Sequence, residues 1–300
     1  TKNLIHGHEC DAAACLPGFG TPGSDTSYPI PAIGVGDGDR LANTDVLTFR
    51  FIAGAGQEVA SIAGNVIQLS NFATTLPGAI NPLPANSRVL VASCTGATPL
   101  VAADVVASGG GSITVNIPSG QKLLSSDGLT RVFNLDRDVR SITYFVANNI
   151  VDGRSIPTLY SVNNGTVNAL IEGVDRFDVL YGVGTGIGTG ATPTKQLQYL
   201  TATQVQNLPA VNCRPLPNEM GNAGFINDVG CGWRGVETIQ IHLLLNTVQD
   251  STHDDNIQFM YSMLDNLNLQ SPSNLGTGID TYRLHRKEFY ASIALKNSQK

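Results

Sequence analysis

Short runs of β-branched and apolar residues, separated by turn-forming residues, recur along most of the chain and limit its fold more than any other feature. Runs of this kind are typical of antiparallel strands. The segments expected to be strands are Val46 to Ile52, Ser87 to Ala92, Ser112 to Ile117, Arg131 to Leu135, Ser141 to Ala147, Thr158 to Val162, Thr166 to Ile171 and Arg176 to Val183. Asn164-Gly165 supplies the positive φ angles that a type I′ turn requires, so residues 160–167 are expected to form a hairpin. The sequence therefore predicts a mainly β fold.

Composition excludes the main alternatives to a β fold. Charged residues make up only 14% of the chain and hydrophobic residues 42%, which is too little charge for a helical bundle and too apolar for a disordered chain. Val236 to Leu245 is long and strongly apolar, so it is expected to lie centrally in a sheet. Thr201 to Asn207 is expected to be a short helix, and Ile279 to Leu295 to supply the last strand or strand pair.

The chain shows no internal repeat and no domain-sized linker, so residues 1–300 are expected to form a single globular domain. Residues 1–45 contain many Pro and Gly, which predicts an irregular amino-terminal segment. Residues 208–232 have no strong periodicity and are rich in Pro, Gly and Asn, which indicates a loop insertion. Such a loop gains from a covalent crosslink at its ends.

Five cysteines, an odd number, leave at least one thiol unpaired. Cys213 and Cys231 bracket the loop insertion and are expected to form one disulfide. Cys10 and Cys15 would close a tight terminal loop as a second one, which would leave Cys94 reduced in a strand. Spacing alone leaves these pairings open.

Several clusters contain residue types that bind metals, but none has the spacing of a metal site. Asp37, Asp39, Asn43 and Asp45 offer oxygen ligands for Ca²⁺ without the spacing of a calcium loop. His6, His8 and Cys10 are expected at an unstructured end that lacks a defined fourth ligand. Asp250, Asp254 and Asp255 are expected in a solvated loop. No metal or cofactor is expected.

The chain also lacks a recognisable catalytic motif. The glycines of Gly186 to Ala191 match a relaxed dinucleotide fingerprint, but the following Thr192 to Thr194 cannot open the required helix, so a hairpin loop is favoured. His242 is expected to be a structural strand histidine, and Trp233, the only tryptophan, a core or loop anchor. No enzymatic activity is predicted.

Charge and hydropathy limit the partners. A net charge of -6 argues against broad binding to nucleic acid or to an anionic membrane, and Arg283 to Lys287 is expected to be a solvated strand edge rather than a polyanion contact. No apolar run is long enough to span a membrane. Because the sequence starts at Thr1 without Met, removal of an amino-terminal segment is expected.

Two segments carry a resemblance to a known family: residues 168–183, NALIEGVDRFDVLYGV, and residues 282–297, YRLHRKEFYASIALKN. The first contains glutamate-glycine-valine and then leucine-tyrosine-glycine, and it resembles a block of the PilW family of type IV pilus minor pilins. The second is similar to the last strand of that family. The order of Tyr199 to Val205, Trp233 and Val236 to Leu245 also agrees, as does Asp45 to Phe51. The family's first hydrophobic helix is absent, the usual aspartate-rich loop is Gly/Thr-rich, and the Cys213 to Cys231 insertion is a departure.

The resemblance implies a pilin-like or pseudopilin-like globular domain with antiparallel sheets and long loops, α+β in the full-length pilin. It implies a subunit anchored in the inner membrane, with its globular domain in the periplasm and later at the pilus tip. Expected partners are other minor pilins and the major pilin, with a large tip adhesin as a further candidate and no direct contact with nucleic acid. Expected roles are priming of pilus assembly, adhesion, twitching motility and, in competent bacteria, DNA uptake.

Two rival functions stay open within the same fold class. A J-type pseudopilin of type II secretion shares the fold and serves another machine, and a tip adhesin would bind a ligand of its own. An extracytoplasmic hydrolase or lectin-like protein is disfavoured, because the acidic and aromatic residues that line such clefts are scattered along this chain.

Overall fold

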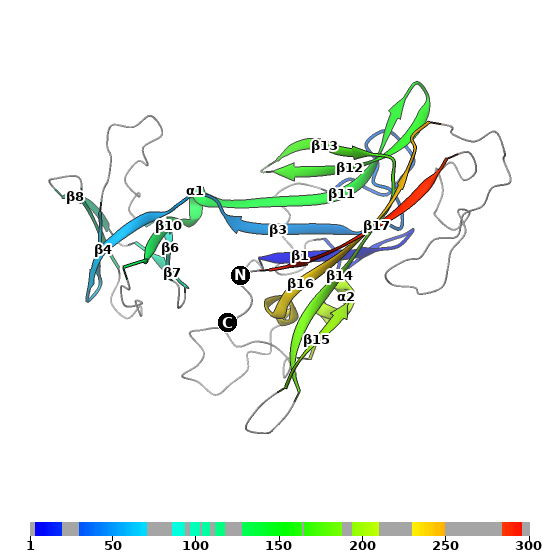
Figure 1. Cartoon of the computed structure of the whole chain (residues 1–300). Helices are drawn as coiled ribbons and strands as arrows, with labels where there is room; N and C mark the ends of the chain where they lie inside the picture. Colours follow the sequence, from blue (N-terminus) through cyan, green and yellow to red (C-terminus); the bar gives the residue numbers. More distant parts are fainter. Residues whose placement is uncertain are drawn as a thin grey trace. The chain divides into compact units, whose positions relative to one another are not determined.

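The computed structural model describes residues 4–19, 30–70, 86–93, 97–102, 104–108, 112–117, 128–163, 165–187, 194–209, 230–249 and 284–295. Strands dominate these residues and form three antiparallel sheets, with only short helices (Figure 1). The predicted mainly β fold is confirmed. Within the described ranges, no helix has the length and apolar character needed to cross a membrane.

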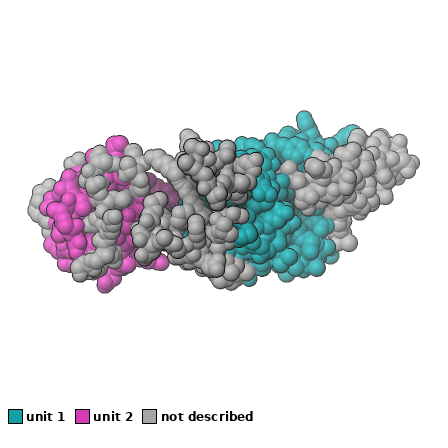
Figure 2. All heavy atoms as spheres, turned by 90° about the horizontal axis from the view of Figure 1, so that it is seen from below, with its two compact units in different colours: residues 1–50, 141–300 teal, residues 51–140 magenta. Residues whose placement is uncertain are grey.

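The chain separates into two compact units (Figure 2). Unit 1 consists of residues 1–50 and 141–300, and unit 2 of residues 51–140. Unit 2 is therefore an insertion within the sequence of unit 1. The expectation of a single globular domain over residues 1–300 stays a prediction.

The first sheet of unit 1 has six strands in the order β13-β12-β11-β3-β1-β2. Their bounds are Ile5–Cys10 (β1), Cys15–Leu16 (β2), Val46–Ile52 (β3), Val139–Val151 (β11), Arg154–Asn163 (β12) and Thr166–Glu172 (β13). The hairpin predicted around Asn164-Gly165 joins β12 to β13, with Val162 opposite Val167 and Gly165 at a φ of 88°.

The sequence predicts that residues 1–45 are irregular, but part of this segment forms regular structure. Strand β1 pairs antiparallel with β3, from Ile5 opposite Phe49 to His8 opposite Val46. The sequence of β1, IHGHEC, does not have the apolar pattern of a buried strand, because two histidines occupy positions where apolar residues are usual. Both imidazoles are fully buried, so tertiary packing overrides the local signal.

The second sheet of unit 1 has four strands in the order β15-β14-β16-β17. Their bounds are Val174–Ile187 (β14), Thr194–Leu200 (β15), Val236–Asn246 (β16) and Arg286–Ala294 (β17). Strand β16 pairs with β14 on one side and β17 on the other, which confirms its predicted central place. Helix α2 (Ala202–Gln206) begins at a capping box in which Thr201 and Gln204 bond each other's backbone N–H groups.

The two sheets of unit 1 share one apolar core. Leu47 and Val146 of the six-stranded sheet pack in the same cluster as Val179, Tyr181 and Ile239 of the four-stranded sheet. The 3₁₀ helix η3 (Cys231–Gly235) contributes the buried Trp233 to this cluster, so the prediction of Trp233 as a core anchor is confirmed.

Unit 2 is a separate sheet with its own core. Its strands follow the order β7-β6-β10-β4-β5-β9-β8. Their bounds are Gln57–Ala63 (β4), Val66–Leu69 (β5), Arg88–Ala92 (β6), Ala97–Val101 (β7), Asp104–Ser108 (β8), Ser112–Asn116 (β9) and Arg131–Asn134 (β10), followed by α1 (Leu135–Asp138). Strand β4 pairs with β10 at its start and with β5 from Val59 onward, and the pairing with β5 has a register shift between Val59 and Ser61. The buried cluster is entirely aliphatic and combines residues from β6 and β10 with residues from β5 and β9.

Cys10 and Cys15 form a disulfide between β1 and β2. Cys94 and Cys213 lie outside the described residues, and only the backbone of Cys231 is described, at the start of η3. The Cys213–Cys231 disulfide and the free Cys94 therefore stay predictions, as does most of the loop insertion at 208–232.

Candidate functional site

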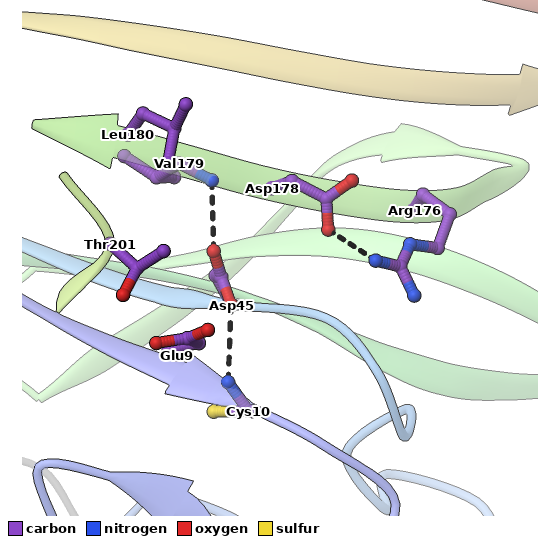
Figure 3. A pocket seen from close by; sticks show the side chains of 8 residues that line it. All are labelled: Glu9, Cys10, Asp45, Arg176, Asp178, Val179, Leu180 and Thr201. Atoms are coloured by element: carbon purple, nitrogen blue, oxygen red, sulfur yellow. Dashed lines mark hydrogen bonds and ion pairs between the residues drawn. The ribbon is translucent and has the colours of Figure 1, made fainter. Parts of the chain in front are cut away.

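A buried aspartate joins the two sheets of unit 1. Asp45, directly before β3, lies between β1 and β14 (Figure 3). Its carboxylate accepts hydrogen bonds from the backbone N–H of Val179 at 2.8 Å and of Cys10 at 3.1 Å. Its own N–H donates to the carbonyl of Phe177 at 2.7 Å. Because β15 pairs with β14 only from Tyr181 onward, Asp45 takes the place of a neighbouring strand along this part of β14.

Charged groups of β14 surround this joint. Arg176 donates to Asp178 at 2.6 Å in a buried ion pair, and the other oxygen of Asp178 lies 3.1 Å from His242 Nδ1. Burial and the neighbouring Asp178 raise the pKa of Asp45 well above its ordinary value, while the two N–H donors and Arg176 oppose that rise. The joint therefore holds buried charge that its hydrogen bonds only partly offset.

A small cavity opens beside Asp45 and has a volume of about 30 Å³. Its lining consists of Glu9, Cys10, Asp45, Arg176, Asp178, Val179, Leu180 and Thr201 (Figure 3). Small-molecule sites usually measure roughly 300–1,000 Å³, whereas this space has room for about two water molecules. The cavity has room for water beside the carboxylates but is too small for a substrate.

The two histidines of β1 form a second buried polar cluster. The imidazole of His6 stacks on Trp233, with ring centroids 4.5 Å apart, and lies 4.9 Å from the ring of His8. The indole Nε1 of Trp233 donates to Gln206 of α2 at 2.8 Å, and Tyr181 meets the indole edge-on at 4.8 Å. The prediction that His6 and His8 lie at an unstructured end is therefore wrong. They are core residues that hold β1 against α2 and η3.

Burial keeps both imidazoles neutral. It lowers the pKa of His6 to about 3, helped by His8 and Arg50, while Gln206 opposes the change. Burial likewise lowers the pKa of His8 to about 4, while the carbonyl of Pro17 opposes the change. Cys10 is in a disulfide, so its thiolate cannot join the two histidines as a metal ligand.

The aspartates considered as Ca²⁺ ligands accept hydrogen bonds from backbone N–H groups instead. Asp37 accepts from the N–H of Ile150 at 3.0 Å, Asp39 from the N–H of Gly36 at 2.8 Å, and Asp45 forms the joint. Asn43 adopts a positive φ of 56°. Across the ranges that the structure describes, no three His, Cys, Asp or Glu side chains converge as a metal site would require. Asp250, Asp254 and Asp255 lie outside those ranges.

The remaining candidate residues are in strands. His242 is fully buried in β16 and stacks under the ring of Tyr290, with centroids 4.5 Å apart. Its Nε2 has no hydrogen-bond partner among the described residues, so the pair with Asp178 is not extended to a nucleophile. Gly186 and Ile187 end β14, which pairs with β15 as the predicted hairpin, and residues 188–193 are outside the description.

Sequence reasoning missed the buried ion pair between Asp175 and Arg286, at 2.6 Å, which links the start of β14 to β17. The sequence does contain a signal for this ion pair. Asp175, Arg176 and Asp178 interrupt an otherwise apolar strand, and charges in such a strand are retained only when they are paired. Arg286 belongs to the segment expected to be a solvated edge, and that expectation is wrong for this residue. Lys287 fits it, because its side chain is exposed.

Comparison with known proteins identifies the family to which this chain belongs. The model of the family described as type IV pilus-assembly protein W matches residues 143–297. No curated protein and no solved structure matches the chain. The match contains both segments that carried the resemblance and begins after unit 2, so the resemblance of Asp45 to Phe51 stays a prediction. Since the match spans more than half of the 300 residues, the chain belongs to the PilW family of type IV pilus-assembly proteins.

Proposed function

We propose that this chain is a minor pilin that binds other minor pilins, primes assembly of the type IV pilus and becomes part of its tip complex. The observation that carries the proposal is the family match over residues 143–297. This stretch contains the whole four-stranded sheet and the outer strands β12 and β13 of the six-stranded sheet. The part of the chain shared with the family is thus the carboxyl-terminal segment of unit 1.

The chemistry of unit 1 suits a binding platform better than a catalyst. Its buried carboxylates serve as hydrogen-bond acceptors and ion-pair partners, and the cavity beside Asp45 is too small for a substrate. A non-enzymatic role in the periplasm, on a subunit anchored in the inner membrane, follows from the family as part of the proposal. Adhesion, twitching motility and DNA uptake would then depend on this subunit through the pilus it helps to build.

Charge distribution supports protein partners rather than nucleic acid. Unit 2 balances five acidic residues (Glu58, Asp104, Asp127, Asp136 and Asp138) against five basic ones (Arg88, Lys122, Arg131, Arg137 and Arg140). The whole net charge of -6 therefore belongs to unit 1. An acidic unit repels polyanions, so direct binding to DNA is disfavoured.

The test is co-elution of this chain with purified periplasmic domains of the host's other minor pilins, measured by size-exclusion chromatography with light scattering. A complex of defined mass supports the priming role. The periplasmic domains of type II secretion pseudopilins serve as the matched control, because a J-type pseudopilin would bind them instead. No complex with any minor pilin would refute the proposal.

A second candidate function rests on unit 2. Its separate core and its position outside the family match are what a tip adhesin with a ligand-binding module of its own would have. Binding of the whole chain to host surfaces or glycans, compared with a chain that lacks residues 51–140, tests this candidate. Equal binding by the two chains would exclude unit 2 as the binding module.

A further inference from the structure

Residues 15–19 form a cover over one of the two buried histidines of β1. The carbonyl of Pro17 accepts a hydrogen bond from Nδ1 of His8, and the ring of Phe19 packs on the imidazole with centroids 4.5 Å apart. The guanidinium of Arg40 lies over the ring of Phe19, 5.8 Å from its centroid. His8 is fully buried, and residues 15–19 therefore supply part of the shell that separates its imidazole from solvent.

The strand that carries this cover is short. Strand β2 has two residues and pairs with β1 at two positions, Leu16 opposite Glu9 and Cys15 opposite Cys10. The carbonyl of Leu16 accepts a hydrogen bond from the hydroxyl of Thr203 in α2 at 3.4 Å, which is long for an O–H···O bond. Because a pairing of two short strands is marginal in water, the Cys10–Cys15 disulfide adds the covalent restraint that the pairing itself lacks.

From these contacts we propose that the disulfide is a redox-controlled clamp. When the bond is formed, residues 15–19 close over His8, and when it is reduced, they detach while the rest of unit 1 stays folded. The pairing of β1 with β3 and the stacking of His6 on Trp233 do not involve residues 15–19, so both should survive reduction. The clamp goes beyond the proposed function and does not depend on it, because it involves no pilin partner.

The clamp opens and closes by thiol–disulfide exchange. On opening, a thiolate of a dithiol attacks one sulfur of the Cys10–Cys15 bond, and the other sulfur leaves as a thiolate that takes up a proton. The second thiolate of the dithiol then attacks the mixed disulfide and releases the remaining cysteine, so two electrons pass to the protein and the dithiol becomes a disulfide. Closing is the reverse reaction, with a protein or small-molecule disulfide as the oxidant. Both cysteines are buried, but every residue of the turn between them, 11–14, is exposed, so an exchange partner would approach the bond at this turn.

The imidazole of His8 reports whether the clamp is closed. With residues 15–19 in place, burial lowers the pKa of His8 to about 4, the bond to Pro17 opposes this change, and Arg40 and Arg50 add to it. The other titratable ring beside it, that of His6, lies 4.9 Å away and is neutral as well, because burial lowers its pKa to about 3. Contact with solvent removes the cost of charging a buried imidazole, so opening should return the pKa of His8 toward its ordinary value of 6.5.

The test is an NMR titration of the imidazole signals in the oxidised chain, in the chain reduced with dithiothreitol, and in the double variant Cys10→Ser/Cys15→Ser. The double variant confines the change to this one bond. We expect the pKa of His8 to rise from about 4 toward 6.5 in the reduced chain and in the variant. His242 is the matched control, because it is equally buried but lies in β16, and its signals should differ little between the oxidised and reduced chains. Far-UV circular dichroism and Trp233 fluorescence report whether unit 1 stays folded.

Two outcomes of the titration would overturn the clamp. If the pKa of His8 stays near 4 in a folded Cys10→Ser/Cys15→Ser chain, the disulfide is a crosslink without control over residues 15–19. If that variant loses its β structure, the bond holds the whole of unit 1 together rather than the cover alone.

A variant with the disulfide intact tests the cover by itself. Phe19→Ala removes the ring that packs on His8, so diethyl pyrocarbonate should modify His8 at pH 7 about tenfold faster than in the wild type. Phe51→Ala is the matched control, because Phe51 is similarly exposed, at 45% against 41% for Phe19, and it lies at the far end of β3. An unchanged rate in Phe19→Ala would show that residues 15–19 do not shield His8, and it would overturn the clamp as well.

Discussion

Replacing Asp45 should destabilise unit 1 by an amount that its hydrogen bonds predict. In Asp45→Ala, the N–H groups of Cys10 and Val179 lose their acceptor in a buried place. Each unsatisfied group costs about 1–3 kcal/mol, but removing a buried carboxylate beside Asp178 returns part of that cost. We expect a net loss of about 3 kcal/mol in the free energy of unfolding, which is roughly a hundredfold in the folding equilibrium constant.

The variant Asp45→Asn preserves the shape of the Asp45 side chain but removes its ability to ionise. The amide retains one acceptor oxygen, so the loss should be about 1 kcal/mol. The folded state raises the pKa of Asp45, so the stabilisation linked to its protonated form is complete below about pH 3.8 and is lost as the pH rises through the raised pKa. Asparagine does not titrate, and the stability difference between wild type and Asp45→Asn should therefore narrow from pH 4 to pH 8.

Trp233 makes this measurement specific to unit 1. It is the only tryptophan and packs against His6 and Tyr181, so its fluorescence in urea titrations follows the unfolding of unit 1. Asp37→Ala is the control, because that carboxylate accepts one exposed N–H and should cost about 0.5 kcal/mol or less. A cost below about 0.5 kcal/mol for Asp45→Ala as well would refute the role of Asp45 as the joint between the sheets.

Three further predictions follow from the histidines, the disulfide and unit 2. The folded state lowers the pKa of His8 to about 4, so the stabilising contribution of the neutral imidazole is complete above about pH 6.5 and is lost as the pH falls through 4. The urea midpoint of His8→Gln should therefore approach that of wild type as the pH is lowered from 7 to 4.5. Removing the disulfide with Cys10→Ser and Cys15→Ser should lower the unfolding free energy of unit 1 by about 2 kcal/mol, and mass spectrometry before and after reduction counts the bridges. Residues 51–140 should fold alone, because the strand pairs of the seven-stranded sheet that the structure describes, and its aliphatic core, are internal to unit 2. A circular dichroism spectrum without β structure would contradict this.

Sequence reasoning predicted strands best where apolar residues follow the period of a strand. Val236 to Leu245 is central in its sheet, and every other run expected to be a strand overlaps one. In unit 2 the strands β4, β5, β7 and β8 were missed. Residues such as Glu58 in β4 and Pro99 in β7 interrupt the apolar pattern that identifies a strand. Local propensity carries less information where packing against neighbouring strands decides the structure.

The joint could not be predicted for a different reason. Asp45 was considered as an oxygen ligand, but its true partners are backbone N–H groups 35 and 134 residues away. Backbone donors have no residue type, so no sequence pattern identifies them. His6 likewise packs on Trp233, which is far away in the sequence. Membership of the family, in contrast, was readable because its two segments are continuous.

The insertion of unit 2 also bears on how this protein could have evolved. The chain leaves unit 1 at the end of β3 and returns at the start of β11, which are neighbouring strands joined by the Thr48–Thr143 hydrogen bond at 2.9 Å. Just inside unit 2, the N–H of Ala53 donates to the carbonyl of Asp138 at 2.8 Å, so the two ends of the inserted segment are adjacent. A segment with adjacent ends can be acquired, exchanged or deleted as one genetic cassette without changing the register of its host sheet. Relatives that connect β3 to β11 by a short turn would be the expected ancestral form.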